Sequence, residues 1–211
     1  MKLAHVLAGA LIVTSLPLAA AAQDYEHRPG FLLRLTGGIG YARTTQVPSG
    51  DLDVKFHLGG PNLDTSVALG FALGDSFALH ATGGAYYVIS PKVTGEVGGF
   101  GSSTTLDDAS FRQYLIGLGF TTWFSGNVYL TASVGGANIG IKYDNIDYKD
   151  DAWGLGGELL VGKEWFLGPA FGIGFAVGGT WHVVPEKDGR LRDIDALRGF
   201  SAGARLSLTF N

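Results

Sequence analysis

Six large polar side chains stand in segments whose other residues are apolar or small. They are two arginines, two glutamates, a histidine and a glutamine: Arg34, Arg205, Glu158, Glu164, His80 and Gln113. A buried charge without a partner is costly, so charges that share one interior must neutralise one another. Two arginines and two glutamates therefore predict a neutral ionic network that fills an interior. The alternatives are a static structural plug and a gated path for ions, and we favour the plug.

Catalytic and metal-binding chemistry receives less support from the sequence. His80 or His182 would suit general acid–base work, but no spacing places a serine and a carboxylate beside either histidine. The acidic stretch 144–151 lacks the regular spacing and central glycine of an EF-hand loop, so we favour a solvated loop over a Ca²⁺ site. We predict no catalytic residue, no metal site and no cofactor, and we expect that the protein is not an enzyme.

An alternation of apolar with small or polar residues predicts that the six side chains lie on β-strands. The clearest example is 198–210, where every second residue from Phe200 to Phe210 is apolar. This stretch is longer than a typical soluble strand and matches the ~9–11 residues that cross a bilayer. Seven further segments share the period: 31–42, 66–73, 77–87, 113–124, 128–141, 153–165 and 171–183. The six polar side chains all fall on the small, inward-facing set.

The connections between these segments alternate in length. Short turns are expected at 74–76, 125–127 and 167–169, and long loops at 44–62, 90–109, 144–151 and 185–196. This layout predicts an all-β, eight-stranded, antiparallel up-and-down transmembrane barrel with the long loops extracellular. Glycine pairs recur in alternate strands, and we favour a curvature device over mere abundance of glycine. The apolar set of 128–141 shifts by one residue after Gly135 and Gly136, which predicts a β-bulge there.

Composition and the first residues indicate the compartment. Residues 1–22 read as a cleavable secretory signal rather than a membrane anchor, because Lys2 precedes an apolar run that ends in alanines. Residues 23–30 form a polar periplasmic lead-in, and the barrel occupies 31–211. The chain has no cysteine, and 46% of its residues are hydrophobic, yet no apolar run after residue 22 is long enough for a membrane helix. A net charge of −4 argues against nucleic acid as a partner.

Aromatic residues on the outward face fall near the strand ends. The periplasmic and extracellular membrane interfaces are where such residues belong in a membrane barrel. Core packing in a soluble barrel is the weaker explanation, because the residues cluster at both ends. The predicted interface aromatics are Tyr41, Tyr87, Trp153, Trp165, Trp181 and Phe210.

The strand 198–210, which ends on an aromatic at the penultimate residue, resembles the closing strand of bacterial outer-membrane β-barrels. In that family the terminal strand is the signal read by the insertion machinery, which here implies Phe200, Leu206, Leu208 and Phe210. The mature chain as a whole resembles the small eight-stranded group that includes the OmpA transmembrane domain, OmpX and OmpW-like proteins. The resemblance implies export to the outer membrane of a Gram-negative cell envelope. It also implies contact with outer-membrane lipids and lipopolysaccharide, and insertion by the barrel-assembly machinery with periplasmic chaperones.

Two functions remain open on this resemblance. The first, which we favour, is a non-catalytic structural or surface-interaction role in which long extracellular loops meet an unknown partner. The second is a narrow or gated, porin-like channel for small solutes. Some outer-membrane barrels are enzymes, and the lipid A deacylases among them carry a His and a Ser two residues apart. Here Thr82 follows His80 at that spacing and Val184 follows His182, so that motif is absent.

Overall fold

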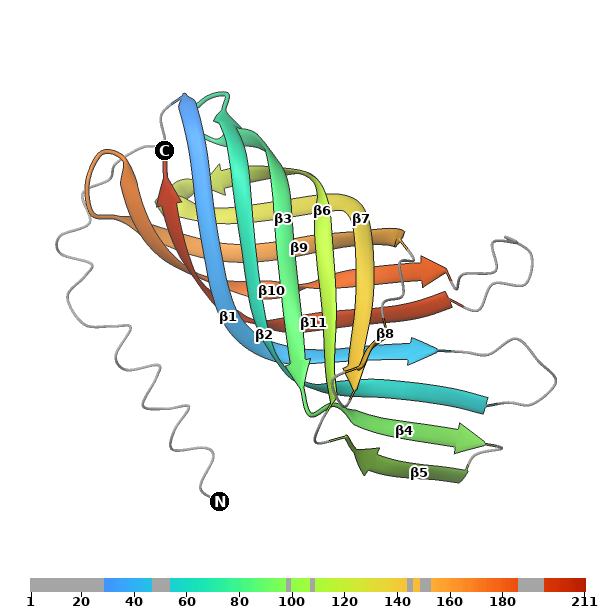
Figure 1. The fold of residues 1–211 in the computed structure, drawn as a ribbon. Helices are drawn as coiled ribbons and strands as arrows, with labels where there is room; N and C mark the ends of the chain where they lie inside the picture. Colours follow the sequence, from blue (N-terminus) through green and yellow to red (C-terminus); the bar gives the residue numbers. More distant parts are fainter. Residues whose placement is uncertain are drawn as a thin grey trace, which may run out of the picture.

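The computed structural model describes residues 29–46, 54–97, 100–106, 109–143, 146–148, 153–185 and 196–211 (Figure 1). The strands are β1 (Gly30–Gln46), β2 (Val54–Ala72), β3 (Phe77–Ile89), β4 (Lys92–Val97), β5 (Phe100–Thr105), β6 (Ala109–Phe124), β7 (Val128–Tyr143), β8 (Ile146–Tyr148), β9 (Trp153–Phe166), β10 (Phe171–Pro185) and β11 (Ala196–Phe210). Within these residues no helix combines the length and the apolar character needed to span a membrane. The predicted signal 1–22 and most of the lead-in 23–30 lie outside the described residues.

Eight of the strands close into an antiparallel barrel, which confirms the predicted fold class. In order round the wall they are β1, β2, β3, β6, β7, β9, β10 and β11. Each pairs with the next, and β1 pairs with both β2 and β11, so the sheet has no free edge along the barrel wall. Following the paired residues once round the wall from Gly30 leads back to β1 at Gly40, a stagger of ten residues. Such a stagger tilts the strands, and an eight-stranded barrel leaves an interior only wide enough for side chains.

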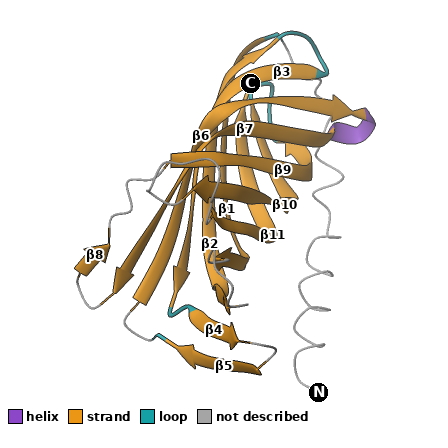
Figure 2. Cartoon of the chain, turned by 90° about the vertical axis from the view of Figure 1, so that its right-hand side faces the viewer, coloured by secondary structure: helices purple, strands orange, loops and turns teal. Residues whose placement is uncertain are grey.

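The two ends of the barrel differ. Short connections join β2 to β3, β6 to β7 and β9 to β10, and the C-terminus lies at the same end, which we call the turn end (Figure 1). At the tightest connection, Ser125–Asn127, Gly126 has φ 72° and Asn127 has φ 57°, conformations that these two residue types tolerate best. The opposite end, which we call the loop end, carries β4, β5 and β8 (Figure 2).

Two predicted loops are largely strand. The loop expected at 44–62 is wrong in most of its length, because β1 runs to Gln46 and β2 begins at Val54. Pro61 is tolerated inside β2 because it lies between the residues that pair with β3 and those that pair with β4. The loop expected at 90–109 contains the β4–β5 hairpin, which continues the sheet along the projecting edge of β2.

The predicted bulge at Gly135 and Gly136 is also wrong. Both glycines pair without interruption to β6 on one side and β9 on the other. Ala137 and Ile139 are buried, so the strand keeps its phase and turns these two apolar side chains into the barrel. Glycine is required at Gly135 because a Cβ there would collide with the carbonyl oxygen of Ile116 on β6. The apolar shift in the sequence therefore marks a change in what the interior contains.

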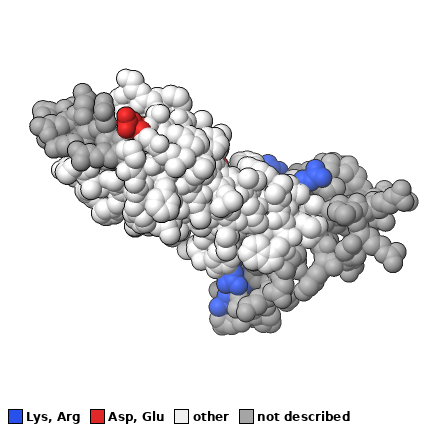
Figure 3. Space-filling view, turned by 90° about the horizontal axis from the view of Figure 1, so that it is seen from above, with Lys and Arg blue, Asp and Glu red and all other residues white. Residues whose placement is uncertain are grey.

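The barrel is apolar on its outside and mixed on its inside. Large hydrophobic side chains point outward along every barrel strand, among them Ile39, Leu118 and Leu206, each more than 65% exposed. Figure 3 shows a broad band of the outer face without charged atoms, and the Lys and Arg atoms visible there lie on the half nearer the loop end. All three acidic residues of the barrel strands, Asp64, Glu158 and Glu164, are buried inside.

Candidate functional site: the filled lumen

The turn end of the lumen is packed with apolar and aromatic side chains. Their shared property is burial, at 5% exposure or less: Leu32, Ala72, Ala78, Trp123, Tyr129, Leu160 and Ala176. Because successive strand residues alternate between faces, each of these comes from the inward set of its strand. The first ionic group of the lumen packs against this cluster through Trp123 and Tyr129.

The first ionic group joins Arg34 of β1 to Glu164 of β9 across the lumen. The Nη2 atom of Arg34 lies 3.0 Å from Oε1 of Glu164, and its Nε donates to the same oxygen at 3.0 Å. Trp123 Nε1 donates to the other carboxylate oxygen at 3.0 Å, and the hydroxyl of Thr209 donates to Oε1. Both charged side chains are at most 2% exposed. The pair is therefore fully desolvated and held by neighbouring polar groups.

Arg34 has a second set of contacts on its other side. Its Nη1 donates to the hydroxyls of Thr121 at 3.1 Å and Thr131 at 2.9 Å. The guanidinium carbon lies 4.1 Å from the ring centroid of Tyr129, which is a cation–π arrangement. Arg34 therefore connects β1 to strands on the opposite wall, and a rigid fork of donors suits this role better than a lysine ammonium.

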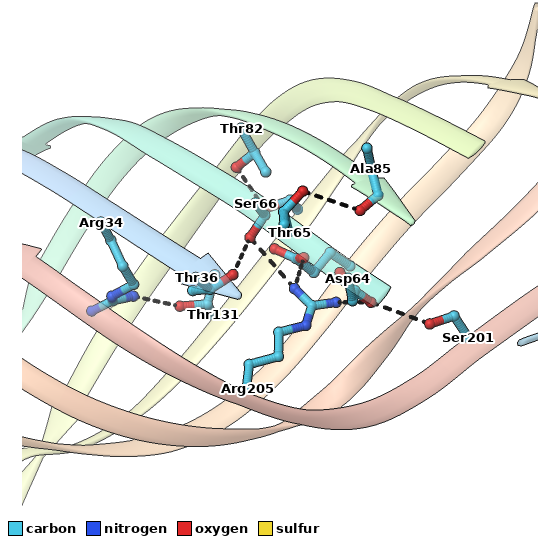
Figure 4. Close-up of polar contacts among 12 residues, drawn as sticks. Arg34, Thr36, Asp64, Thr65, Ser66, Thr82, Ala85, Thr131, Ser201 and Arg205 are labelled. Carbon is cyan, nitrogen blue, oxygen red and sulfur yellow. Dashed lines mark hydrogen bonds and ion pairs between the residues drawn. The ribbon is translucent and has the colours of Figure 1, made fainter. Parts of the chain in front are cut away.

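The second ionic group centres on Arg205 of β11 (Figure 4). Its Nη2 lies 2.9 Å from Oδ2 of Asp64, and its Nη1 donates to Glu158. Ser201 also donates to Asp64, at 3.2 Å, and Ser66 lies 3.4 Å from Nη1 of Arg205. One guanidinium is therefore shared between two buried carboxylates that come from β2 and β9.

Asp64 is the member of this network that sequence reasoning missed. The sequence predicts a loop at 44–62 and a strand from Ser66, and Asp64 lies between the two. Extending the period of Ser66 and Ala68 back by one step would have placed Asp64 on the inward face. With Asp64 included, three buried carboxylates face two buried guanidinium groups. The expected balance of two against two is therefore wrong.

The two arginines lie at different depths in the lumen. Arg34 is four residues from the first residue of β1 and Arg205 is five residues from the last residue of β11, so distance along each strand alone would place them at similar depths. The register pairs Arg205 with Gly38, four residues beyond Arg34 along β1, because closure staggers β11 against β1. Two stacked ionic groups therefore occupy the lumen.

The other polar residues predicted for the lumen are also buried there. His80 contacts Thr82 through Nδ1 at 2.9 Å and Thr121 through Nε2 at 3.2 Å, which links it to the hydroxyls around Arg34. Gln113 is 1% exposed, and its Oε1 accepts no hydrogen bond within the described part of the chain. His182, higher in the barrel, contacts Thr44 at 3.3 Å and Tyr86 at 3.4 Å.

An apolar layer lies above the second ionic group, toward the loop end. Its members are again buried: Ala42, Tyr86, Val88, Phe111, Ala137, Ile139 and Val184, with Leu58 and Leu197 packed against them. Tyr86 and Phe111 pack with their ring centroids 5.9 Å apart and their planes tilted by 45°. The lumen thus has apolar layers at both ends and two ionic groups between them.

The outer face places the predicted interface aromatics at the two ends of the strands. Tyr41, Tyr87, Trp153 and Trp181 point outward near the loop end, where Tyr87 also meets Tyr114 edge-on. The residues proposed as an insertion signal point outward as well, from Phe200 at the loop end to Phe210 at the turn end. Phe210 packs against Phe171 of β10, with ring centroids 5.1 Å apart.

Two hollows lie on the outside of the described barrel, both nearer the loop end. One, of about 580 Å³, is lined by Ile39, Pro61, Leu63, Tyr87 and Ile89 together with Gly40 and Asn62. The other, of about 510 Å³, lies over β10, β11 and β1 and is lined by two arginines and two aromatic residues among others.

No protein-family model matches the sequence, and no curated protein matches it either. Several solved structures are similar in fold. Neisserial surface protein A is 13% identical, with 85% of this chain and 96% of that chain covered at a TM-score of 0.46. The outer membrane protein OprG from Pseudomonas aeruginosa is 12% identical, with 90% and 100% covered at a TM-score of 0.42.

The attachment invasion locus protein Ail of Yersinia pestis, in complex with the heparin analogue sucrose octasulfate, is 11% identical. In that match 86% of this chain and 99% of that chain are covered at a TM-score of 0.41. The fold thus defines the class: a closed, eight-stranded antiparallel β-barrel with an apolar outer face. Likeness at this level carries no inference about function, because one barrel architecture supports many functions.

Proposed function

We propose that this chain is an integral outer-membrane β-barrel whose lumen is a structural plug and whose loop end carries a non-catalytic surface-interaction role. The observation that carries the proposal is the filling of the lumen. Arg34, Glu164, Arg205, Glu158 and Asp64 join opposite walls between two apolar layers. Because these ion pairs join opposite walls across the lumen, they have to break before ions can pass through the barrel.

The membrane location is supported by the outer face. Leu118 is 72% exposed, Leu206 70% and Ile39 68%, and an apolar surface of this extent is unfavourable in water. A bilayer removes that cost, because each outward residue then meets lipid while the backbone stays paired in the closed barrel. The aromatic residues at both ends lie where the two interfaces of the membrane would be.

Conductance in a planar bilayer separates the plug from the channel. We expect no steady unitary current from the folded wild-type protein, because the ionic groups and the apolar layers occupy the lumen. A steady current that changes with Glu164→Ala or Arg34→Ala would overturn the plug and support the narrow channel.

A substitution on the outer face tests the bilayer itself. Leu118→Arg places a charge at mid-height on an outward position, where a bilayer disfavours arginine by about 2–4 kcal/mol. The same change on a water-exposed surface is nearly neutral. Urea titration of protein folded in phospholipid vesicles measures the difference, and Leu118→Ala serves as the control for lost side-chain volume. An Arg variant as stable as the Ala variant would remove the membrane assignment.

Outer-membrane lipids and lipopolysaccharide are the partners we propose for the outer face, with the barrel-assembly machinery and periplasmic chaperones as transient partners. The terminal strand supports an insertion signal, since Leu206, Leu208 and Phe210 present an unbroken outward apolar row. We expect Phe210→Ala to slow machinery-assisted insertion while spontaneous folding into thin vesicles proceeds. Equal slowing of both rates would assign Phe210 to packing alone.

A further inference from the structure

The hollow over β10, β11 and β1 differs from the rest of the outer face because two arginines open onto it. Its volume is about 510 Å³, and its outward-facing lining is Arg43, Thr45, Trp181, Val183, Arg198 and Phe200. Apolar side chains make up most of the surrounding outer surface. Two arginines and two aromatic rings therefore share one hollow, and this combination suits a ligand with an anionic group and an apolar part.

The register brings the two arginines together. Arg43 of β1 pairs with Phe200, and Arg198 of β11 pairs with Thr45, so the arginines are diagonal neighbours on adjacent strands. Diagonal neighbours on one face of a sheet are about 7–8 Å apart, which long side chains span easily. Both arginines are exposed, and both line the same hollow. Two guanidinium forks can therefore meet on one anion.

No acidic residue of the described barrel strands offers these arginines a partner. Asp64, Glu158 and Glu164 all point into the lumen, where Arg34 and Arg205 hold them. Two neighbouring cations repel each other, and an anion between them removes the repulsion. The charge pattern thus selects an anionic ligand.

The level of the hollow along the barrel axis indicates that the anion belongs to a lipid. Arg43 lies two residues beyond Tyr41 toward the loop end, and Arg198 lies two residues beyond Phe200. Two strand residues rise about 6–7 Å, less after strand tilt, so the guanidinium groups lie just above the aromatic belt. Headgroup phosphates occupy that level in a bilayer. Below them, Trp181 and Phe200 face the region of sugars and acyl chains.

We propose that this hollow binds the phosphate of a phosphorylated lipid in the leaflet at the loop end. Arg43 and Arg198 donate charge-assisted hydrogen bonds to the phosphate oxygens, and Trp181 and Phe200 pack against the apolar part of the same lipid. This inference rests on the proposed membrane location and adds to it one defined site, with a stated ligand chemistry, on one side of the barrel.

Native mass spectrometry of the folded protein released from detergent micelles tests the site. The probes are bisphosphorylated lipid A, the same lipid with its phosphates removed, and inorganic phosphate. We expect one bisphosphorylated lipid A to stay bound to wild-type protein, no retention of the dephosphorylated lipid, and no displacement by millimolar inorganic phosphate. The double variant Arg43→Gln, Arg198→Gln should weaken binding about tenfold or more, because both charge-assisted donors are lost.

Arg112→Gln is the matched control. Arg112 is also an outward cation near the loop end, but it lies over Tyr114 on β6, away from the hollow. Its loss should leave lipid A binding within about twofold of wild type. Equal weakening by Arg112→Gln would show diffuse attraction and overturn the site. Equal retention of the dephosphorylated lipid, or full displacement by inorganic phosphate, would overturn the phosphorylated lipid as the ligand even if the variants did not fold.

Failure of this inference is distinguishable from failure of the membrane location. Folding of the same proteins into phosphatidylcholine vesicles is measured in parallel by resistance to added protease. Vesicle insertion without selective lipid A binding would overturn the proposed lipid site but not the proposed membrane location. Absence of insertion would overturn both proposals.

Discussion

The two ionic groups inside the barrel solve the same problem in different ways. At the turn end, one carboxylate meets one guanidinium, and Trp123 and Thr209 also donate hydrogen bonds to Glu164. Higher up in the described lumen, one cation, Arg205, pairs with both Asp64 and Glu158, and Ser201 also donates to Asp64. In the first group, several donors share in stabilising one carboxylate. The second group depends on a single cation, so substitutions of its members should differ far more in the unfolding free energy that they cost.

Arg205→Ala should have the largest effect. It leaves two carboxylates buried together without their cation, and removing one partner of a buried pair already costs about 3–5 kcal/mol. We expect a loss in unfolding free energy at or above the top of that range in a urea titration at pH 7 in vesicles. A loss no larger than that of Glu164→Ala would contradict the shared-cation description.

Glu164→Ala should rank second. The substitution leaves Arg34 buried without its counter-ion, although Thr121, Thr131 and the ring of Tyr129 still contact the guanidinium. The expected loss is about 3 kcal/mol, at the lower end of the range for breaking a buried pair. The same titration measures it. A loss equal to that of Arg205→Ala would mean that the surrounding donors contribute nothing.

Trp123→Phe isolates one donor of the first group. It removes the Nε1 hydrogen bond to Glu164 while keeping most of the ring, and a hydrogen bond to a charged group contributes about 1.5–3 kcal/mol. Trp165→Phe on the outer face is the control, with an expected change below about 1 kcal/mol. Equal effects of the two tryptophan variants would show that ring packing, and not the hydrogen bond, holds Glu164.

Asp64→Asn should have the smallest effect. The amide keeps an acceptor for Arg205 and Ser201, Glu158 keeps its ion pair, and the lumen changes from three carboxylates against two arginines to two against two. We expect a change below about 1 kcal/mol in the unfolding free energy. A loss as large as that of Glu164→Ala would show that the second carboxylate is essential and would end the contrast between the groups.

The strand pattern was readable because the outer face and the lumen of the barrel carry opposite chemistry on alternate residues. The long period-two runs from Phe31 to Phe210 and the short turns between them led directly to the eight-stranded barrel. Pattern reading failed where the interior itself became apolar. Ala137 and Ile139 looked outward by hydrophobicity alone, and only the unbroken ladder through Gly135 and Gly136 shows that they line the lumen.

The sequence by itself determined the inward face of Arg34, Arg205, Glu158 and Glu164, because a strand fixes the side of every residue once its period is known. Only the tertiary structure decided which charges meet. The stagger of the closed barrel sets the depth of each charged side chain in the lumen. As a result Arg34 meets Glu164, and Arg205, which lies nearer the loop end, meets Glu158 and Asp64. The same closure brings Arg43 and Arg198 side by side from opposite ends of the described chain. Register between distant strands depends on the whole sheet, and a single strand's pattern does not contain it.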